Sequence, residues 1–396
     1  MPTNVIRLLW FSQIIAIGSM EMSGPFWPLI LSQQSQGVSL SVFSALIYIL
    51  PLLGAMFSAP VWGKLGDRIG HKYMILRALF VLALSQCLLL YVKEVEWVCL
   101  IRFVQGVCAG SIAAMQAYAL RTSKTQEQGQ ILGKLQSSVA AGTLLGPVLG
   151  GMLIDYWGFN SVFTLGSVSC LLVFFAVALL LPEDKNGPVN KARGKSTARV
   201  ISPPLFSLPV LLCLLALAQL AKRLPSSFFA IYGQDVLEAS SFQIGMLYGL
   251  TGFAILLFAP YWGRYFDRAN NQQIKNSLLL ICTMAGLSQF AFSFVEQSLL
   301  LAGLLRFIWG IFLAAILPLL FMQLRKLVTT NDIGKSIGMG HSASKLGALI
   351  GIGVGAISIS LLAINQGFSM IAVTYMIMIL LIAICAKNKN KDKKEN

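Results

Sequence analysis

Twelve apolar segments, each long enough to cross a membrane, constrain the fold of this 396-residue chain more than any other feature. A spanning helix needs roughly 20 mostly apolar residues. Hydrophobic residues make up 56% of the chain and charged residues only 11%. The expected spans are 6–31, 38–62, 74–92, 97–120, 131–154, 161–181, 206–232, 239–262, 274–293, 298–322, 335–360 and 363–386. Because lipid cannot satisfy backbone hydrogen bonds, the sequence predicts an all-α membrane protein with twelve transmembrane helices.

An internal repeat divides these segments into two halves. Ala59–Arg68 reads APVWGKLGDR and Ala259–Arg268 reads APYWGRYFDR, with six identical positions. LIRFVQG around Arg102 returns as LLRFIWG around Arg306, 204 positions later. We therefore expect two pseudo-symmetric six-helix bundles. Transporters built from such repeats bind their solute near the membrane midplane, where the repeats meet.

The boundaries of the halves follow from the polar gaps. The N-terminal bundle is predicted at 1–181 and the C-terminal bundle at 206–386, with a linker at 182–205 and a basic tail at 387–396. The linker is rich in Lys, Arg, Gly, Ser and Pro and is too short to bury a core. Linker and tail are both expected in the cytoplasm.

The placement of the basic residues predicts the orientation. Most of the 30 Lys and Arg residues fall at the termini or in every second connection. Because Lys and Arg are retained on the cytoplasmic side, both termini are expected there. The net charge of +15 therefore reflects membrane topology and gives no reason to expect nucleic acid. We expect a multi-pass protein of the cell inner (cytoplasmic) membrane, in contact with membrane lipid.

Enzymatic chemistry has no support in the sequence. There are two histidines, His71 and His341, and seven cysteines without paired or metal-type spacing. No phosphate-binding loop is present. We expect no catalytic residues, no metal and no cofactor.

Three motifs resemble a known family. GKLGDRIGHK, residues 63–72, matches the signature loop G-x-L-x-D-R-x-G-R-K of the major facilitator superfamily at every fixed position but one, where His71 stands for Arg. LIRFVQG resembles the fourth-helix motif of its drug:proton antiporters. GTLLGPVLGG, residues 142–151, is similar to their fifth-helix motif G-x-x-x-G-P-x-x-G-G. The resemblance covers nearly the whole chain and implies a transporter of the twelve-helix drug:proton antiporter group that works by alternating access.

The resemblance implies that the repeated loop is a latch that gates the cytoplasmic side. The implied gate residues are Gly63, Asp67, Arg68 and Gly70 in the first copy, and Asp267 and Arg268 in the second. Glycines at these spacings permit a tight turn of about ten residues. Asp67 is then expected near a helix N-terminus, where a carboxylate is favoured. The alternative is that Asp67 and Arg68 only anchor helix ends.

Two glycine stripes predict close helix packing. The first consists of Gly142, Gly146 and Gly150, and the second of Gly347, Gly351 and Gly355. Residues four apart share a helical face, and small side chains let backbones approach closely. Pro147 removes a backbone donor and can bend the first of these helices. Two interpretations stay open: packing alone, or the antiport-specific role that the resemblance implies.

One carboxylate lies deep in the predicted spans. A charged side chain there costs about 2.5–3.5 kcal/mol on insertion scales and must be offset by function or by a partner. Glu21 is the candidate proton carrier, because burial favours a carboxyl that can hold a proton. Its structural alternative is an ion pair with Arg102. We assign Glu21 and Arg102 to proton coupling.

Basic groups outnumber that acid at membrane depth. The candidates for substrate binding are Lys222, Arg223, Arg306, His341 and Lys345. Lys222 and Arg223 either face a cavity or lie at the outer surface. Because a basic cavity prefers an anion, we expect proton-coupled export of a small organic anion, such as a carboxylate siderophore or metabolite, by a monomer.

Three alternatives remain at this point. Aromatic side chains on the same helices could form a pocket for hydrophobic drugs: Phe26, Trp27, Phe228, Phe229 and Trp309. The same fold could take up its solute by symport with protons. A non-transport membrane sensor could also retain the fold.

Overall fold

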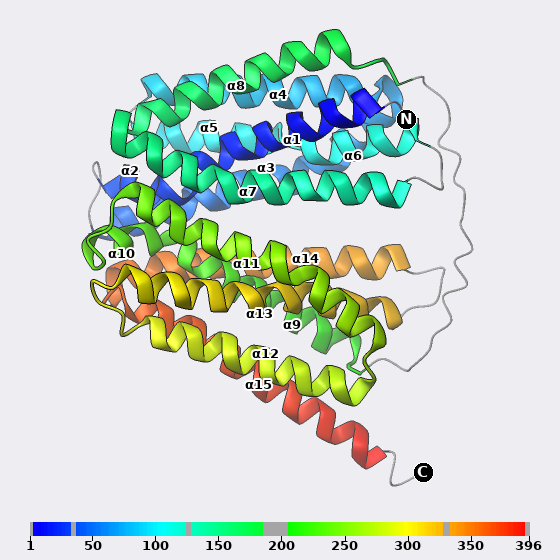
Figure 1. The fold of residues 1–396 in the computed structure, drawn as a ribbon, viewed down its shortest axis with the longest axis vertical. Coiled ribbons are helices and arrows are strands. Elements are labelled where there is room, and N and C mark those ends of the chain that lie inside the picture. Colours follow the sequence, from blue (N-terminus) through cyan, green and yellow to red (C-terminus); the bar gives the residue numbers. More distant parts are fainter. Residues whose placement is uncertain are drawn as a thin grey trace. The chain divides into compact units, whose positions relative to one another are not determined.

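The computed structural model describes residues 3–32, 37–92, 94–123, 128–184, 205–327 and 333–392, and these form helices without any strand (Figure 1). The first half contains α1 (Thr3–Ser23), η1 (Gly24–Phe26), α2 (Trp27–Ser32), α3 (Gly37–Ile69), α4 (His71–Tyr91), α5 (Val95–Val107), α6 (Ser111–Thr122), α7 (Gln128–Trp157) and α8 (Phe159–Leu180). The second contains α9 (Leu208–Arg223), η3 (Leu224–Ser227), α10 (Phe229–Asp235), α11 (Ser241–Arg268), α12 (Asn271–Phe292), α13 (Leu299–Lys326), α14 (Ile333–Leu361) and α15 (Gln366–Asp392).

The predicted all-α membrane fold is confirmed. Among the described residues, ten helical stretches are long and apolar enough to cross a membrane. The two remaining predicted spans, 274–293 and 335–360, are the helices α12 and α14, of 22 and 29 residues. Most of the predicted linker, residues 185–204, and the end of the predicted tail, residues 393–396, lie outside the described residues.

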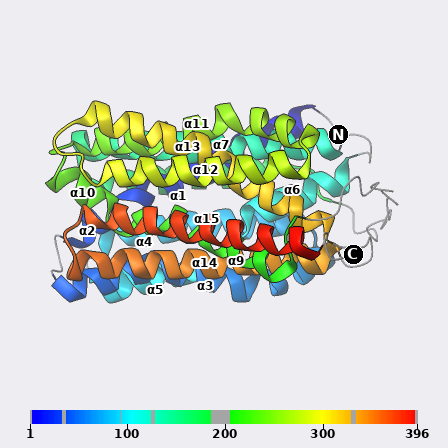
Figure 2. The same cartoon turned by 90° about the horizontal axis from the view of Figure 1, so that it is seen from below.

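The chain separates into two compact units. Unit 1 comprises Met1–Gly194 with Ala239–Gly249, and unit 2 comprises Lys195–Glu238 with Leu250–Asn396. In unit 1, α1 packs on α7 and α4 packs on α8. In unit 2, α9 packs on α14, and α12 packs on α15, which lies beside it in Figures 1 and 2. Each half therefore pairs its first span with its fifth and its third with its sixth, as a duplicated bundle requires.

The repeated tryptophan makes the same contact in both halves. The indole of Trp62 donates a hydrogen bond to the carbonyl oxygen of Val107, 2.6 Å away. The indole of Trp262 donates to the carbonyl oxygen of Ile311, 2.9 Å away. An indole N–H inside a membrane protein needs such an acceptor, since lipid supplies none. The repeated sequence thus forms the same helix–helix contact in each half.

The first span of each half is broken at the same place. Pro25 is the second residue of the short 3-10 helix η1 after α1, and Pro225 is the second residue of η3 after α9. A proline lacks the backbone N–H that would continue the α-helical ladder. Glu21 precedes the first break, and Lys222 precedes the second. Both predicted functional residues therefore lie beside the break of a discontinuous helix.

Both glycine stripes pack against the first span of their own half. A Cβ added at Gly150 would come within 2.1 Å of the Met22 carbonyl oxygen. One added at Gly347 would come within 1.9 Å of the Ala216 carbonyl oxygen. Because a backbone cannot yield as a side chain can, these positions require glycine. The stripes have a packing role, and the antiport-specific role of the first stripe stays a prediction.

We expect Gly347→Ala to destabilise the protein by about 1–3 kcal/mol, because the added methyl group overlaps the α9 backbone. Gly353→Ala, on the same helix with nothing within 4 Å of the added Cβ, is the matched control. The control should be neutral or gain up to about 1 kcal/mol from helix propensity. Thermal unfolding of both purified variants checks this prediction. Equal melting temperatures would contradict the close approach of α14 to α9.

The signature loop is shorter than the sequence suggested. The predicted turn of about ten residues is wrong, because α3 continues to Ile69 and α4 begins at His71. Gly63 and Gly66 lie inside α3, and Gly70 alone makes the turn, with φ of +99°. The expected position of Asp67 near a helix N-terminus is also wrong, since it lies in the last turn of α3.

Candidate functional site

Arg102 is the centre of a buried polar cluster in unit 1. It lies on α5 with 6% of its surface exposed. Its Nη1 donates to Gln105 Oε1 at 2.6 Å, and its Nε donates to the Ile47 carbonyl oxygen at 3.3 Å. The guanidinium carbon lies 5.3 Å from the centroid of the Trp27 ring. The contacts give a buried cation polar and aromatic neighbours in place of water.

Glu21 belongs to the same region of unit 1. It is half-buried on α1, and its charge acts on Arg102 electrostatically, as does the Tyr48 phenol. The Tyr48 hydroxyl donates to the Gly24 carbonyl oxygen at 2.7 Å, at the break between α1 and α2. A Cβ added at Gly146 would lie 2.6 Å from Glu21 Cβ. The first glycine stripe therefore packs directly against Glu21, the predicted proton carrier.

Arg306 occupies the equivalent position in unit 2 but has different neighbours. It is 2% exposed, and its guanidinium carbon lies 4.1 Å from the Phe229 ring centroid and 5.2 Å from that of Trp309. Trp309 replaces the residue equivalent to Gln105, and its indole donates to the Tyr375 hydroxyl at 3.0 Å. Each half thus contains one buried arginine. Arg102 has the Gln105 amide beside it, whereas Arg306 lies between aromatic rings.

The other predicted substrate residues are less buried. Lys222 is half-buried at the end of α9, whereas Arg223 beside it is exposed. On α14, Lys345 is half-buried and His341 is exposed, with its ring centroid 4.8 Å from that of Phe321. The structure therefore buries one of the five predicted substrate residues, Arg306, almost completely.

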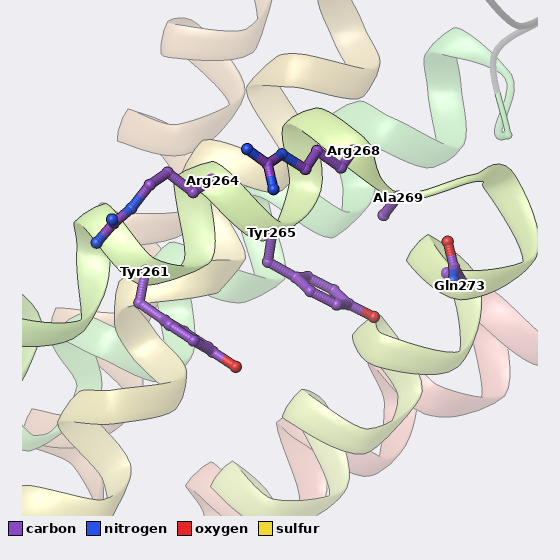
Figure 3. A pocket seen from close by; sticks show the side chains of 6 residues that line it. All are labelled: Tyr261, Arg264, Tyr265, Arg268, Ala269 and Gln273. Carbon is purple, nitrogen blue, oxygen red and sulfur yellow. The ribbon is translucent and has the colours of Figure 1, made fainter.

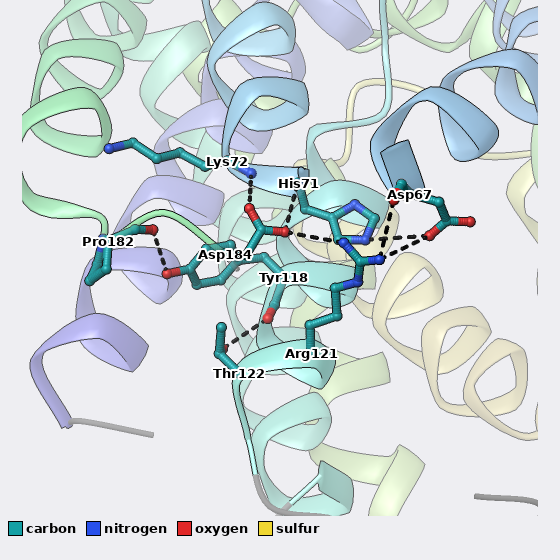
Figure 4. A network of polar contacts seen from close by, with 8 residues as sticks. All are labelled: Asp67, His71, Lys72, Tyr118, Arg121, Thr122, Pro182 and Asp184. Carbon is teal, nitrogen blue, oxygen red and sulfur yellow. Dashed lines mark hydrogen bonds and ion pairs between the residues drawn. The ribbon is translucent and has the colours of Figure 1, made fainter. Parts of the chain in front are cut away.

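The signature loop forms a second cluster, which Figure 4 shows. Asp184, just after α8, accepts hydrogen bonds from the backbone N–H groups of His71 at 2.7 Å and Lys72 at 3.2 Å. Asp184, and not Asp67, is therefore the carboxylate at a helix N-terminus. Arg121 Nη1 lies 3.6 Å from Asp184 Oδ2. The Asp184 side chain is only 3% exposed, so its interactions are shielded from water.

Asp67 contributes less to this cluster. Its carboxylate lies 3.9 Å from Arg121 Nη2 and 3.8 Å from His71 Nε2. With 65% of its side chain exposed, each such pair is worth at most about 1 kcal/mol. Arg68 is exposed at the end of α3. In the second copy, Asp267 and Arg268 are both exposed.

The comparisons with known proteins agree with this duplicated helical architecture. Residues 9–305 match the profile of the Major Facilitator Superfamily. The chain belongs to the Major Facilitator Superfamily. It is therefore a multi-pass membrane transporter and not an enzyme.

Relatives of the chain include a siderophore transporter and a multidrug resistance protein. The chain is 28% identical to the staphyloferrin B transporter of Staphylococcus aureus, over 87% of this chain and 84% of that protein. It is 27% identical to multidrug resistance protein MdtG of Proteus mirabilis, over 92% and 90%. Its fold is similar to an inward-facing, unoccupied bacterial homologue of the human lysosomal transporter Spinster, with a TM-score of 0.78, 13% identity and 98% of both chains covered.

Two residues of the loop cluster in this superfamily member were not predicted from its sequence. Asp184 fell in the segment assigned to the linker, where no periodic pattern marks it. Arg121 lies in a predicted connection and is one of its basic residues. A signal for Arg121 did exist, because Arg325 follows it by 204 positions, the same offset that joins Arg102 to Arg306.

Asp184 should make the stability of the loop pH-dependent. Burial alone would raise the pKa of this carboxyl, but the hydrogen bonds from the His71 and Lys72 amides outweigh burial and hold its pKa below the ordinary value. A lowered folded-state pKa contributes stability above the unfolded value, about 3.9. That contribution is lost as the pH falls through the lowered folded-state pKa.

We expect Asp184→Asn to lower the free energy of unfolding at pH 7 by about 1–2 kcal/mol, the value of a helix cap. The loss should shrink as the pH falls towards the lowered pKa of Asp184. Thermal unfolding of the purified protein as a function of pH measures both effects. Glu183→Gln, which removes an exposed neighbouring acid, is the control. A pH-independent difference between wild type and Asp184→Asn would contradict the role of the charge.

Proposed function

We propose that this protein is a proton-coupled exporter of a small organic anion, a carboxylate siderophore or metabolite, that works by alternating access in the cell inner membrane. We assign the proton to Glu21 and Arg102. We assign the substrate to Arg306, with Lys345, Lys222, Arg223 and His341 as further candidates. The signature loops gate the cytoplasmic side, both termini are cytoplasmic and the transporter acts as a monomer.

The imbalance of charge at membrane depth carries the proposal. Glu21 lies well inside the span Asn4–Ser32. The other carboxylates in the spans of the described residues lie within two residues of a span end: Asp67, Glu96, Asp155 and Asp267. By contrast, Arg102 and Arg306 are both deep and nearly inaccessible to water. A region with this excess of positive charge favours an anion over a lipophilic cation.

The surroundings of Arg306 suit a planar carboxylate ligand. Its guanidinium has five N–H donors in a fork that matches a carboxylate. The Phe229 and Trp309 rings stabilise the cation by contact with their faces. The relative named as a staphyloferrin B transporter supports a siderophore as the substrate class.

The position of Glu21 supports proton coupling. A carboxyl can carry a proton if its surroundings stabilise both the charged and the neutral form within a similar range of free energy. Glu21 is partly buried and lies within electrostatic reach of Arg102. We therefore assign uptake and release of the coupling proton to Glu21, beside Arg102.

Efflux of hydrophobic compounds is the second candidate, because other relatives are named as multidrug resistance proteins. The aromatic residues predicted for such a pocket are as buried as Arg306, so burial does not decide between the two candidates. Phe228 and Phe229 have no exposed surface and pack with the Phe368 ring, at centroid distances of 5.0 and 6.1 Å. Trp27 is 1% exposed, and its ring centroid lies 5.5 Å from that of Phe163. These rings belong to the packed cores of their own units.

Mass spectrometry of spent medium tests the substrate class. Cells that lack the gene, and the same cells complemented with it, should differ in one acidic metabolite that only the complemented cells release. Ethidium resistance, measured in the same strains, tests the hydrophobic alternative. Ethidium resistance without any difference in acidic metabolites would contradict anion export. Uptake of the acidic metabolite from the medium by complemented cells would indicate symport.

A further inference from the structure

The second copy of the signature loop borders a pocket in unit 2. The pocket has a volume of about 410 Å³ (Figure 3). It is lined by Tyr261, Arg264, Tyr265, Arg268, Ala269 and Gln273. The first five come from the end of α11 and the turn that follows, and Gln273 comes from the first turn of α12.

The pocket lining contains two arginines and no acidic residue. Arg264 and Arg268 are exposed one turn apart on α11, and Arg264 Nε donates to the Pro260 carbonyl oxygen at 3.2 Å. Within the described ranges, neither arginine has a carboxylate at ion-pair distance. Two guanidinium groups that share a pocket without an acid form a site for an external anion.

The two copies of the loop cap the helix that follows them in different ways. In the first copy, Asp184 caps the N-terminus of α4 and lies near Arg121. In the second copy, Asn270 caps α12 with its own side chain, which accepts from the Gln273 backbone N–H at 2.9 Å. The cap of α12 therefore brings no carboxylate from another segment to this turn.

The exposed face of α11 indicates that the anion belongs to a lipid. Phe253, Leu257 and Tyr261 are 43%, 51% and 57% exposed at intervals of four residues, so they form one apolar stripe. Arg264 and Arg268 continue that stripe to the helix end. Acyl chains can lie along the apolar part, Tyr261 suits the level of the headgroups, and the arginines follow where the phosphate would be.

We propose that Arg264 and Arg268, with Tyr261, Tyr265 and Gln273, bind the phosphate of an anionic phospholipid headgroup such as phosphatidylglycerol. Basic pockets between helices at the cytoplasmic ends of spans are known to bind such headgroups. The side-chain Oε1 of Gln273 accepts from the Asn270 backbone N–H at 2.9 Å, so the side-chain Nε2 is the group that can donate to the ligand. Tyr261, which is exposed, and Tyr265, which is half-buried, correspond to Val61 and Leu65 in the first copy, so the site is specific to the second.

Native mass spectrometry of the purified full-length protein tests the site. Wild type should retain phosphatidylglycerol in preference to phosphatidylcholine. Arg264→Gln/Arg268→Gln should lose this preference by about tenfold or more, given the contribution of a basic residue near anionic lipid. Arg7→Gln/Lys64→Gln removes the same charge from exposed positions elsewhere and should retain the preference. An equal loss in both double variants would overturn the site in favour of a diffuse surface effect.

Two further measurements, both on the wild-type protein, distinguish a lipid headgroup from a soluble phosphate as the ligand. Inorganic phosphate and glycerol 3-phosphate should bind far more weakly than phosphatidylglycerol, and equal binding would show a site for a soluble phosphate and overturn the lipid proposal. Hydrogen exchange should show protection of the amides of residues 261–273 on addition of phosphatidylglycerol but not of phosphatidylcholine. Unchanged exchange in this segment would also overturn the proposal.

Discussion

Replacing Glu21 with glutamine is expected to abolish proton-driven export while the protein remains folded in the membrane. Glutamine keeps the shape and the hydrogen-bonding oxygen of the side chain but cannot take up or release a proton. Glu21 is the carboxyl that lies well inside a described span, so no neighbouring acid at that depth can replace it. We expect a loss of at least about 100-fold in concentrative transport, because coupling to the proton gradient provides its driving force.

The control for this change is Glu96→Gln. Glu96 is exposed at the first turn of α5, so its neutralisation should leave transport unchanged. Exchange of labelled for unlabelled substrate across the membrane needs no proton gradient and should survive in Glu21→Gln. Retention of full concentrative transport in Glu21→Gln under a pH gradient would show that Glu21 is only structural.

Replacing Arg306 with glutamine is expected to reduce transport of an organic anion by about 30-fold or more. Loss of one partner of a buried charge pair costs about 2–5 kcal/mol, and every 1.4 kcal/mol corresponds to a factor of ten. Arg306→Lys keeps the charge but loses the forked geometry, so it should retain part of the activity. Transport assays of both variants with staphyloferrin B as the probe measure the effect.

Arg77→Gln is the matched control for Arg306. Arg77 also lies in a span, with its guanidinium carbon 3.5 Å from the Trp62 ring centroid, and it donates to the Ala109 carbonyl oxygen at 3.0 Å. Its replacement should cost stability but leave the preference for anions unchanged. If Arg306→Gln and Arg77→Gln reduced transport equally, the effect of Arg306 would be one of packing and not of substrate binding.

The sequence predicted the helices and their repeat well, because both depend on patterns that are local. Apolar length marks a span, and Trp62 and Trp262 mark the repeated contact between helices. The glycine stripes also predicted close packing, since three small residues on one face have few other uses. Their partners, Met22 and Ala216, became known only from the structure, because no local pattern specifies the facing helix.

The loop cluster was less predictable because its contacts join distant segments. Asp67 occupies the Asp position of the family signature. However, Asp184, 117 positions later, makes the buried contacts. The end of α3 was also misjudged, because glycine disfavours a helix by only about 1 kcal/mol and tertiary packing can overcome that cost. Gly66 illustrates this point, since an added Cβ would lie 2.9 Å from His71 Nδ1.

Transport by the purified protein in liposomes tests the central claim of proton-coupled anion export most directly. Liposomes with an acidic interior and an internal pH indicator are diluted into neutral buffer that contains labelled staphyloferrin B. The account predicts accumulation of the label inside, with a matching loss of internal acidity that is absent in Glu21→Gln. Accumulation only when the acid is outside, or coupled movement of ethidium but not of the siderophore, would contradict it.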